Sequence, residues 1–126
     1  MARILFVDDD DLTLQLMEKM ANLLGHEAIL STTETEAWTN VQEEHPDAVL
    51  VDLRLRDSSG LALIERLRLN LPETKQIPMY VVSAGRGSND EEEARQVGAA
   101  GFIRKPISLE QLSSIANHKN GNGRKH

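Results

Sequence analysis

Short apolar runs and longer amphipathic stretches alternate along the chain. Four apolar runs have the length of β-strands, at residues 4–7, 48–51, 79–82 and 102–103, and a weaker one lies at 28–30. The first three runs are continuous rather than alternating, which is typical of strands covered by helices on both faces of a parallel sheet. The weaker run is flanked by polar residues, so we expect it at an edge of that sheet.

The segments between these strands have helical periodicity. Apolar residues recur every three or four positions, which predicts helices over residues 12–24, 33–43, 61–69, 90–97 and 109–116. In the first helix the predicted buried stripe comprises Leu12, Leu16, Met17, Met20, Leu23 and Leu24. Five repeats of strand then helix predict a doubly wound α/β fold with an open five-stranded parallel sheet and right-handed crossovers.

Composition excludes several classes of protein. The 126 residues, 40% hydrophobic and 27% charged, fit one globular domain. No apolar run approaches the roughly 20 residues that span a bilayer, and no signal peptide precedes the first strand. We therefore expect a cytoplasmic protein without membrane contact. The absence of cysteine excludes disulfides and thiolate chemistry.

Charge is unevenly distributed along the chain. The formal net charge is −6, although the last ten residues contain three basic side chains and no acid, so the remainder is more acidic still. An acidic body repels a phosphate backbone, which argues against direct binding of nucleic acid. An aromatic content of 3% also argues against a surface on which bases stack.

Polar residues that could take part in catalysis or binding follow four of the predicted strands. Asp8 and Asp9 follow the first strand, Asp52 the third, Ser83 the fourth and Lys105 the fifth. Because the carboxyl ends of parallel strands share one edge of a sheet, we expect these side chains to converge on one crevice. Each residue alone has an explanation as a helix cap or turn residue, but turn chemistry does not explain their registry at four strand ends.

Three carboxylates in one crevice require compensation for their repulsion. Either one carboxyl keeps its proton or a cation joins the group, and we favour the cation. An all-oxygen site with room for water suits Mg²⁺, with Mn²⁺ as a substitute. Zinc is not expected, because the four histidines are scattered and none follows a strand beside the acids. Opposite Lys105, the Asp52 carboxylate is the candidate nucleophile toward phosphorus, and the Ser83 hydroxyl the candidate hydrogen-bond partner of the attached phosphoryl group.

These segments resemble the receiver domains of two-component response regulators, also called CheY-like domains. The resemblance covers residues 2–117. The motifs that carry it are Val7-Asp8-Asp9-Asp10, Val51-Asp52-Leu53 running to Gly60, Val82-Ser83-Ala84, and Gly101-Phe102-Ile103-Arg104-Lys105-Pro106. It implies a flavodoxin-like, three-layer αβα fold with the five strands in the order 2-1-3-4-5, counted along the chain.

The resemblance also implies how the acidic residues function. Asp52 would accept a phosphoryl group from a phosphohistidine on a sensor histidine kinase or a phosphotransfer protein. Asp9 would be a direct Mg²⁺ ligand and Asp8 would act through water. Asp52 itself and the backbone carbonyl of Arg54 would complete the protein's ligands to the metal.

Phosphate binding and switching are implied for residues of the last two strands. Ser83, Ala84 and Lys105 would bind the phosphoryl group. Ser83 and Phe102 would form the switch, with the glycine-containing loop 85–89 absorbing the movement. The surface of the fourth helix, fifth strand and fifth helix would then change shape and contact an output domain or protein.

Two arginines depart from the family pattern, and one proline agrees with it. Arg56 stands where the family commonly has proline, which predicts a more mobile loop over residues 53–60. Arg54 places a long cation beside the phosphorylation site, which predicts slow loss of the phosphoryl group. The Lys105-Pro106 peptide bond is often cis in the family, and a proline permits this geometry.

Two other functions fit part of the pattern. In a haloacid dehalogenase-like phosphatase the nucleophile would be Asp8, but that family requires a further acidic metal motif downstream of Lys105, where only Glu110 remains. A CheY-like binding module that uses no phosphate would have no reason to retain repelling carboxylates. The receiver interpretation implies a protein that catalyses only its own phosphorylation and dephosphorylation.

The chain divides into a receiver domain over residues 1–117 and a basic segment over 118–126. The second segment is rich in Asn and Gly, so we expect a flexible tail or the start of a linker. The interpretation is compatible with a monomer or with a phosphorylation-dependent dimer.

Overall fold

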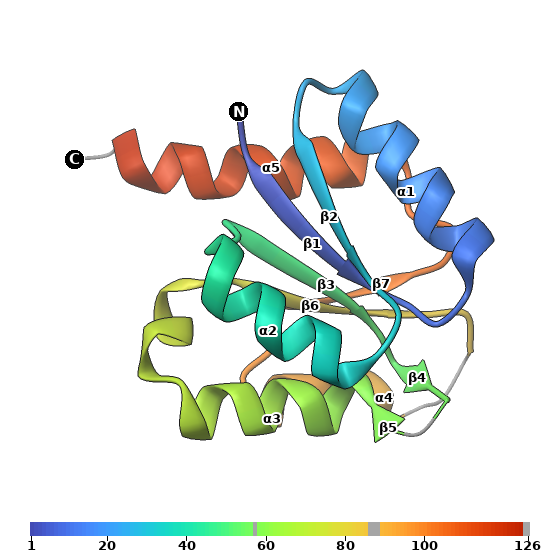
Figure 1. Cartoon of the computed structure of the whole chain (residues 1–126), viewed down its shortest axis with the longest axis vertical. Helices are drawn as coiled ribbons and strands as arrows, with labels where there is room; N and C mark the ends of the chain where they lie inside the picture. Colours follow the sequence, from blue (N-terminus) through green and yellow to red (C-terminus); the bar gives the residue numbers. More distant parts are fainter. Residues whose placement is uncertain (57, 86–88, 125–126) are drawn as a thin grey trace.

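A parallel sheet forms the centre of the molecule. The computed structural model describes residues 1–56, 58–85 and 89–124, with side chains described as far as residue 117. The five strands of the sheet are β1 (Arg3–Val7), β2 (Glu27–Ser31), β3 (Ala48–Asp52), β6 (Met79–Ser83) and β7 (Gly101–Arg104). Their order across the sheet is β2-β1-β3-β6-β7 (Figure 1), which confirms the predicted order 2-1-3-4-5 counted along the chain.

Helices cover both faces of this sheet. In the described part of the chain they are α1 (Asp11–Leu23), α2 (Glu34–Glu44), α3 (Gly60–Asn70), α4 (Asp90–Gln96) and α5 (Leu109–Arg124). Helices α1 and α5 pack on one face through one core cluster, and α2, α3 and α4 pack on the other through a second cluster (Figure 1). The three-layer αβα architecture is therefore confirmed.

The burial of the strands follows from these two layers. Residues 4–7 of β1 are at most 1% exposed, as are residues 48–51 of β3. Strands covered on both faces must be apolar throughout, which explains their continuous apolar runs. Strand β2 lies at the end of the sheet and is only partly buried, as its more polar sequence predicts.

The buried face of α1 differs from the predicted one. Leu12, Leu16 and Leu23 are 74%, 53% and 76% exposed, so their assignment to the core is wrong. The buried residues of the helix are Leu14, Met17, Met20 and Ala21. The helix carries apolar residues on two faces, and a spacing of three or four residues does not decide which face the sheet covers.

Helix α5 is longer than the sequence pattern predicts. Helix α5 begins after Ser108, as predicted, and the Ser108 hydroxyl accepts the backbone N–H of Gln111 at 3.0 Å. It continues to Arg124 rather than ending at residue 116. Residues 118–124, expected to belong to a flexible tail or the start of a linker, are thus helical, and the division of the chain at residue 117 stays a prediction.

Three short elements have no counterpart in the prediction. They are β4 (Arg54–Leu55), β5 (Ser58–Ser59) and the 3-10 helix η1 (Pro72–Gln76). Strands β4 and β5 form an antiparallel pair just beyond β3.

No helix in the described part of the chain has the length and hydrophobicity that crossing a bilayer requires.

Candidate functional site

The carboxyl ends of four strands form one edge of the sheet. Asp52 ends β3 and is in register with Val82 of β6, while Ser83 ends β6 and is in register with Arg104 of β7. Lys105 follows Arg104 directly, and Asp8 follows β1, the other neighbour of β3. Parallel pairing therefore places the residues that follow these strands around one crevice.

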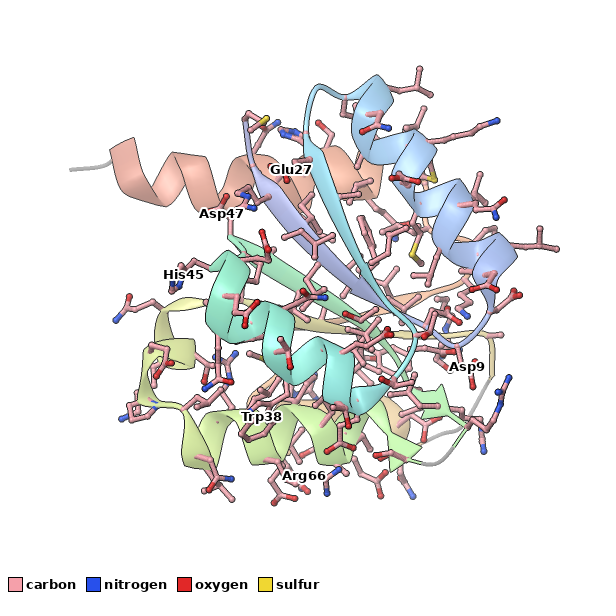
Figure 2. All side chains as sticks on the ribbon, in the orientation of Figure 1. Asp9, Glu27, Trp38, His45, Asp47 and Arg66 are labelled. Carbon is pink, nitrogen blue, oxygen red and sulfur yellow. The ribbon has the colours of Figure 1, made fainter. Side chains whose placement is uncertain are left out.

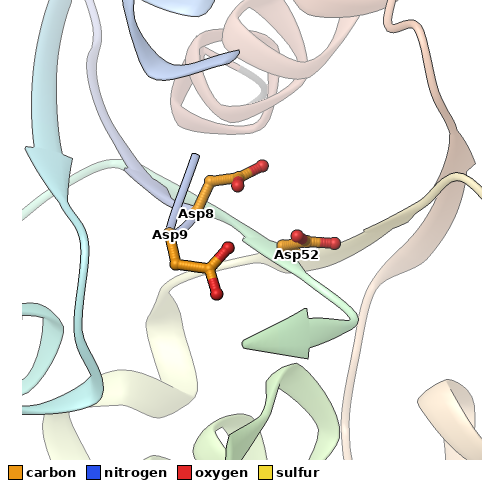
Figure 3. Close-up of side chains that lie close together, drawn as sticks. All are labelled: Asp8, Asp9 and Asp52. Atoms are coloured by element: carbon orange, nitrogen blue, oxygen red, sulfur yellow. The ribbon is translucent and has the colours of Figure 1, made fainter. Parts of the chain in front are cut away.

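Three carboxylates meet in this crevice. Asp8, Asp9 and Asp52 each offer an oxygen, and these oxygens lie within 4.8 Å of one another (Figure 3). Asp8 is 1% exposed, while Asp9 and Asp52 are partly buried. A compact group of carboxylate oxygens with one open side fits Mg²⁺ or Mn²⁺, which prefer oxygen ligands and retain water.

Lys105 provides a positive charge in the same crevice. Its Nζ lies 2.9 Å from Asp8 Oδ2 and 3.4 Å from Asp52 Oδ2. The backbone N–H of Lys105 donates to the Ser83 carbonyl at 2.8 Å, and the peptide bond to Pro106 is cis. Partial burial works to lower the pKa of Lys105, but the hydrogen bond to Asp8 and the charge of Asp52 outweigh it and raise that pKa. The ammonium therefore stays charged at neutral pH.

The environment of Asp52 disfavours its negative charge. Burial raises the pKa of Asp52, and the charge of Asp8 raises it further. Lys105 and the backbone N–H of Arg54 stabilise the carboxylate and offset only part of this effect. Because the pKa is higher in the folded state, the contribution of this group to stability is present at low pH and is lost as the pH rises through the folded-state pKa.

An Asp52→Asn variant should therefore unfold at a higher temperature than the parent when both are metal-free at pH 7. Removing the disfavoured charge should raise the free energy of unfolding of the metal-free protein. Thermal melts in chelator measure this, with Glu18→Gln as a control that removes an equal charge from an exposed position of α1. In excess Mg²⁺ the advantage should shrink, because a cation bound to the native state stabilises the parent more. Equal melting temperatures in chelator would contradict the expectation.

Ser83 ends β6 at the same edge of the sheet. The side chain is 2% exposed, and its hydroxyl accepts the backbone N–H of Gly85 at 3.0 Å. Ala84 is exposed and lines a recess of about 450 Å³ together with Gly85, Arg104 and Lys105. Residues 86–88, the centre of the loop expected to absorb the movement of the switch, lie outside the described residues.

Arg104 connects Phe102 to the loop after β6. Phe102 is partly buried and packs against the core on the α3 side, and the Arg104 guanidinium lies 5.9 Å from its ring centroid. Arg104 also donates to the Gly85 carbonyl at 2.8 Å. Sequence reasoning did not single out Arg104. The sequence did contain a weak signal for this contact. A cation two residues from an aromatic residue on one strand lies on the same face of the sheet and can reach the ring.

A second recess opens beside Asp9. It measures about 230 Å³ and is lined by Asp9, Thr32, Thr33, Glu34, Thr35, Leu55, Arg56 and Ser58. One wall is thus the β4–β5 pair, and another is the start of α2. The side chains of Arg54 and Arg56 are both exposed, and Asp57 between the two strands lies outside the described residues, so the predicted mobility of this loop stays a prediction.

Known proteins share both the sequence pattern and the fold. The model of the response regulator receiver domain matches residues 4–117. The polar-differentiation response regulator DivK of Brucella ovis is 34% identical over 106 residues, which cover 84% of this chain and 85% of that protein. A two-component response regulator from Clostridium difficile superimposes with a TM-score of 0.88 at 19% identity, covering 99% of this chain and 100% of that one.

A second solved structure agrees. The CheY-like receiver domain protein from Methanospirillum hungatei has a TM-score of 0.85 at 23% identity and covers 100% of this chain and 99% of its own. These two structures show the fold, while the family model and the DivK relative show the family. The family model and the DivK relative do not favour a haloacid dehalogenase-like phosphatase or a phosphate-independent module. The chain belongs to the response regulator receiver domain family.

Proposed function

We propose that Asp52 accepts a phosphoryl group from a phosphohistidine on a sensor histidine kinase or phosphotransfer protein. The observation that carries this proposal is the position of the Asp52 carboxylate, which lies within 4.8 Å of oxygens from the Asp8 and Asp9 carboxylates and 3.4 Å from the Lys105 ammonium. Such a carboxylate is held near both a candidate cation site and a fixed positive charge. Phosphoryl transfer needs this combination, because charge on the phosphoryl oxygens must be stabilised during the reaction.

The proposed metal ligands are carboxylate oxygens of Asp9 and Asp52 and the backbone carbonyl of Arg54, with Asp8 acting through water. The donor set supports this assignment, since all of its atoms are oxygens and Lys105 alone does not balance three carboxylates. Bound Mg²⁺ would supply positive charge to the oxygens of the transferring phosphoryl group.

In the proposed reaction an Asp52 oxygen attacks phosphorus while the phosphorus–nitrogen bond of the donor breaks. The electron pair of that bond goes to the donor imidazole, and an acyl phosphate forms on Asp52. Lys105 is placed to bind a phosphoryl oxygen, because its ammonium lies beside the Asp52 carboxylate. The backbone N–H of Ala84 and the Ser83 hydroxyl are further proposed phosphate ligands. Hydrolysis of the acyl phosphate at the same site would return the protein to its starting state.

The proposed switch starts from the Ser83 hydroxyl. This hydroxyl now accepts the Gly85 N–H, and it would have to turn to donate to a phosphoryl oxygen. Arg104 contacts both Gly85 and the Phe102 ring, so a shift of the loop would alter the surface formed by α4, β7 and α5. We propose this surface as the contact for an output domain or protein, in a monomer or a phosphorylation-dependent dimer. We also propose a cytoplasmic location without direct nucleic-acid contact.

Incubation with acetyl phosphate and Mg²⁺ should add one phosphoryl group to the parent protein. Intact mass spectrometry detects the adduct, and reductive trapping followed by peptide sequencing locates it. Asp52→Asn should abolish the adduct because it removes the nucleophile, while Glu18→Gln, which changes an exposed carboxylate, should retain it. An adduct on Asp8 would support the phosphatase alternative, and a parent protein without any adduct would support the phosphate-independent module.

A further inference from the structure

Three residues from separate elements form a hydrogen-bonded group, and two of them line the recess beside Asp9. The Glu34 carboxylate, at the start of α2, accepts Nε and Nη2 of Arg66 from α3, with Nε at 2.7 Å. The same carboxylate accepts the Ser58 hydroxyl of β5 at 2.8 Å, and Arg66 donates to that hydroxyl at 3.3 Å. We call this group, Glu34, Ser58 and Arg66, the Glu34 clamp. It ties β5 to two helices.

The strand that the clamp holds is paired with the residues that follow Asp52. Ser58 is in register with Leu55, and Ser59 is in register with Arg54. The Gly60 N–H donates to the Leu53 carbonyl at 2.8 Å, which closes the loop at its base. A displacement of β5 would therefore move the backbone of Arg54, two residues beyond the candidate phosphoacceptor.

The clamp is also part of the recess that opens beside Asp9. Glu34 and Ser58 both line this recess, and Asp9 lines it as well. Figure 2 labels Asp9 just beyond the end of β1 and Arg66 on α3. Burial of Glu34 is only partial, and the hydrogen bonds from Arg66 keep the pKa of its carboxyl below the ordinary value.

The Glu34 clamp is not expected to contribute much to the free energy of folding. The side chains of Arg66 and Glu34 are 46% and 27% exposed, and ion pairs with such exposure contribute little to the free energy of folding. A carboxylate that accepts from an arginine fork and a hydroxyl together does, however, restrict the direction of all three groups. The geometry therefore favours a positioning role over a stabilising one.

We propose that the Glu34 clamp positions the β4–β5 pair and, through it, the Arg54 carbonyl at the candidate metal site. Glu34, Ser58 and Arg66 are positioning residues in this proposal, since none of them touches the metal or the phosphoryl group. The inference rests on the proposed function, in which the Arg54 carbonyl is a metal ligand. Outer residues that orient metal ligands commonly affect metal affinity, although they make no contact with the ion.

The test is the affinity of the full chain for Mn²⁺, measured from the free-ion signal in electron paramagnetic resonance. Ser58→Ala leaves the ion pair between Glu34 and Arg66 in place and removes its link to β5, together with a 3.5 Å contact from the Ser58 hydroxyl to the Ser59 carbonyl. We expect this variant and Arg66→Gln each to weaken Mn²⁺ binding by about three- to tenfold. The matched control is Arg3→Gln, which breaks ion pairs to Glu27 and Glu44 at the opposite end of the sheet and should bind Mn²⁺ as the parent does.

The outcomes distinguish a failure of the proposed positioning role from a failure of the proposed metal site. If the parent binds Mn²⁺ and Ser58→Ala binds it equally well, the clamp has no positioning role, although the proposed function stands. If Arg3→Gln weakens binding as much as Ser58→Ala, the effect is general destabilisation and the inference fails. If the parent binds no Mn²⁺, the proposed metal site fails, and the inference fails with it. Acetyl phosphate labelling of the same variants then shows whether phosphorylation slows in proportion to the loss of affinity.

Discussion

A Lys105→Met variant should lose about 3 kcal/mol of its free energy of unfolding in the absence of divalent metal. The reason is the burial of Asp8, which is 1% exposed and has the Lys105 ammonium 2.9 Å from Oδ2. Removing the lysine leaves a buried carboxylate without its cation, next to Asp9 and Asp52. Breaking a buried pair in this way costs more than the pair itself contributes, because the remaining charge stays desolvated.

The same substitution should slow phosphorylation by acetyl phosphate about 100-fold, because a fixed positive charge beside the reacting oxygens is lost. Urea unfolding in chelator measures the first effect, and the rate of adduct formation at saturating Mg²⁺ measures the second. Lys19→Met is the control, since it removes an equal charge from an exposed position on α1 and should change neither quantity.

A double variant separates the two effects of Lys105. Adding Asp8→Asn to Lys105→Met removes the unpaired buried charge, so most of the lost stability should return. Phosphorylation should stay slow, because the ammonium is still missing and Asp8, itself part of the proposed metal site, is changed as well. Recovery of both properties would mean that Lys105 serves only to balance Asp8. A single Lys105→Met variant with the stability of the parent would show instead that the Asp8 carboxylate does not need this partner.

The sheet and the position of the site could be predicted from sequence for one physical reason. Strands β1 and β3 are buried on both faces, so they read as continuous apolar runs, and the turn residues that follow them mark their ends. Parallel topology then brings Asp8, Asp52 and Lys105 to one edge without any knowledge of side-chain contacts. The positions of the apolar runs and the parallel topology were enough for this step.

Contacts between distant segments could not be predicted in the same way. The bonds that Glu34 accepts in the clamp come from residues 24 and 32 positions away, and no local pattern in the sequence relates them. Strands β4 and β5 have two residues each, too few to show any periodicity. The exposed leucines of α1 have the spacing of a buried stripe, and only the packing of α1 against the sheet and α5 shows which face is covered.

Gly60→Ala should destabilise the protein strongly, although it adds only one methyl group. A Cβ at position 60 would lie 2.4 Å from the carbonyl oxygen of Asp52 and 3.2 Å from its carbonyl carbon. Neither atom belongs to a flexible side chain, so β3 and the start of α3 would have to separate. We expect a loss of about 3 kcal/mol in the free energy of unfolding, as for other overpacked sites.

The same displacement should reach the chemistry, because it moves the backbone that carries the Asp52 carboxylate. A misplacement of this kind should slow phosphorylation by acetyl phosphate about 100-fold. Gly25→Ala is the control: Gly25 has φ +82°, and a Cβ there would meet no atom within 4 Å, so its substitution strains the backbone far from the site. Both variants should melt at lower temperature than the parent, but only Gly60→Ala should lose phosphorylation. If Gly60→Ala were phosphorylated at the parental rate, the close contact with Asp52 would serve packing alone and the position of the phosphoacceptor would tolerate the shift.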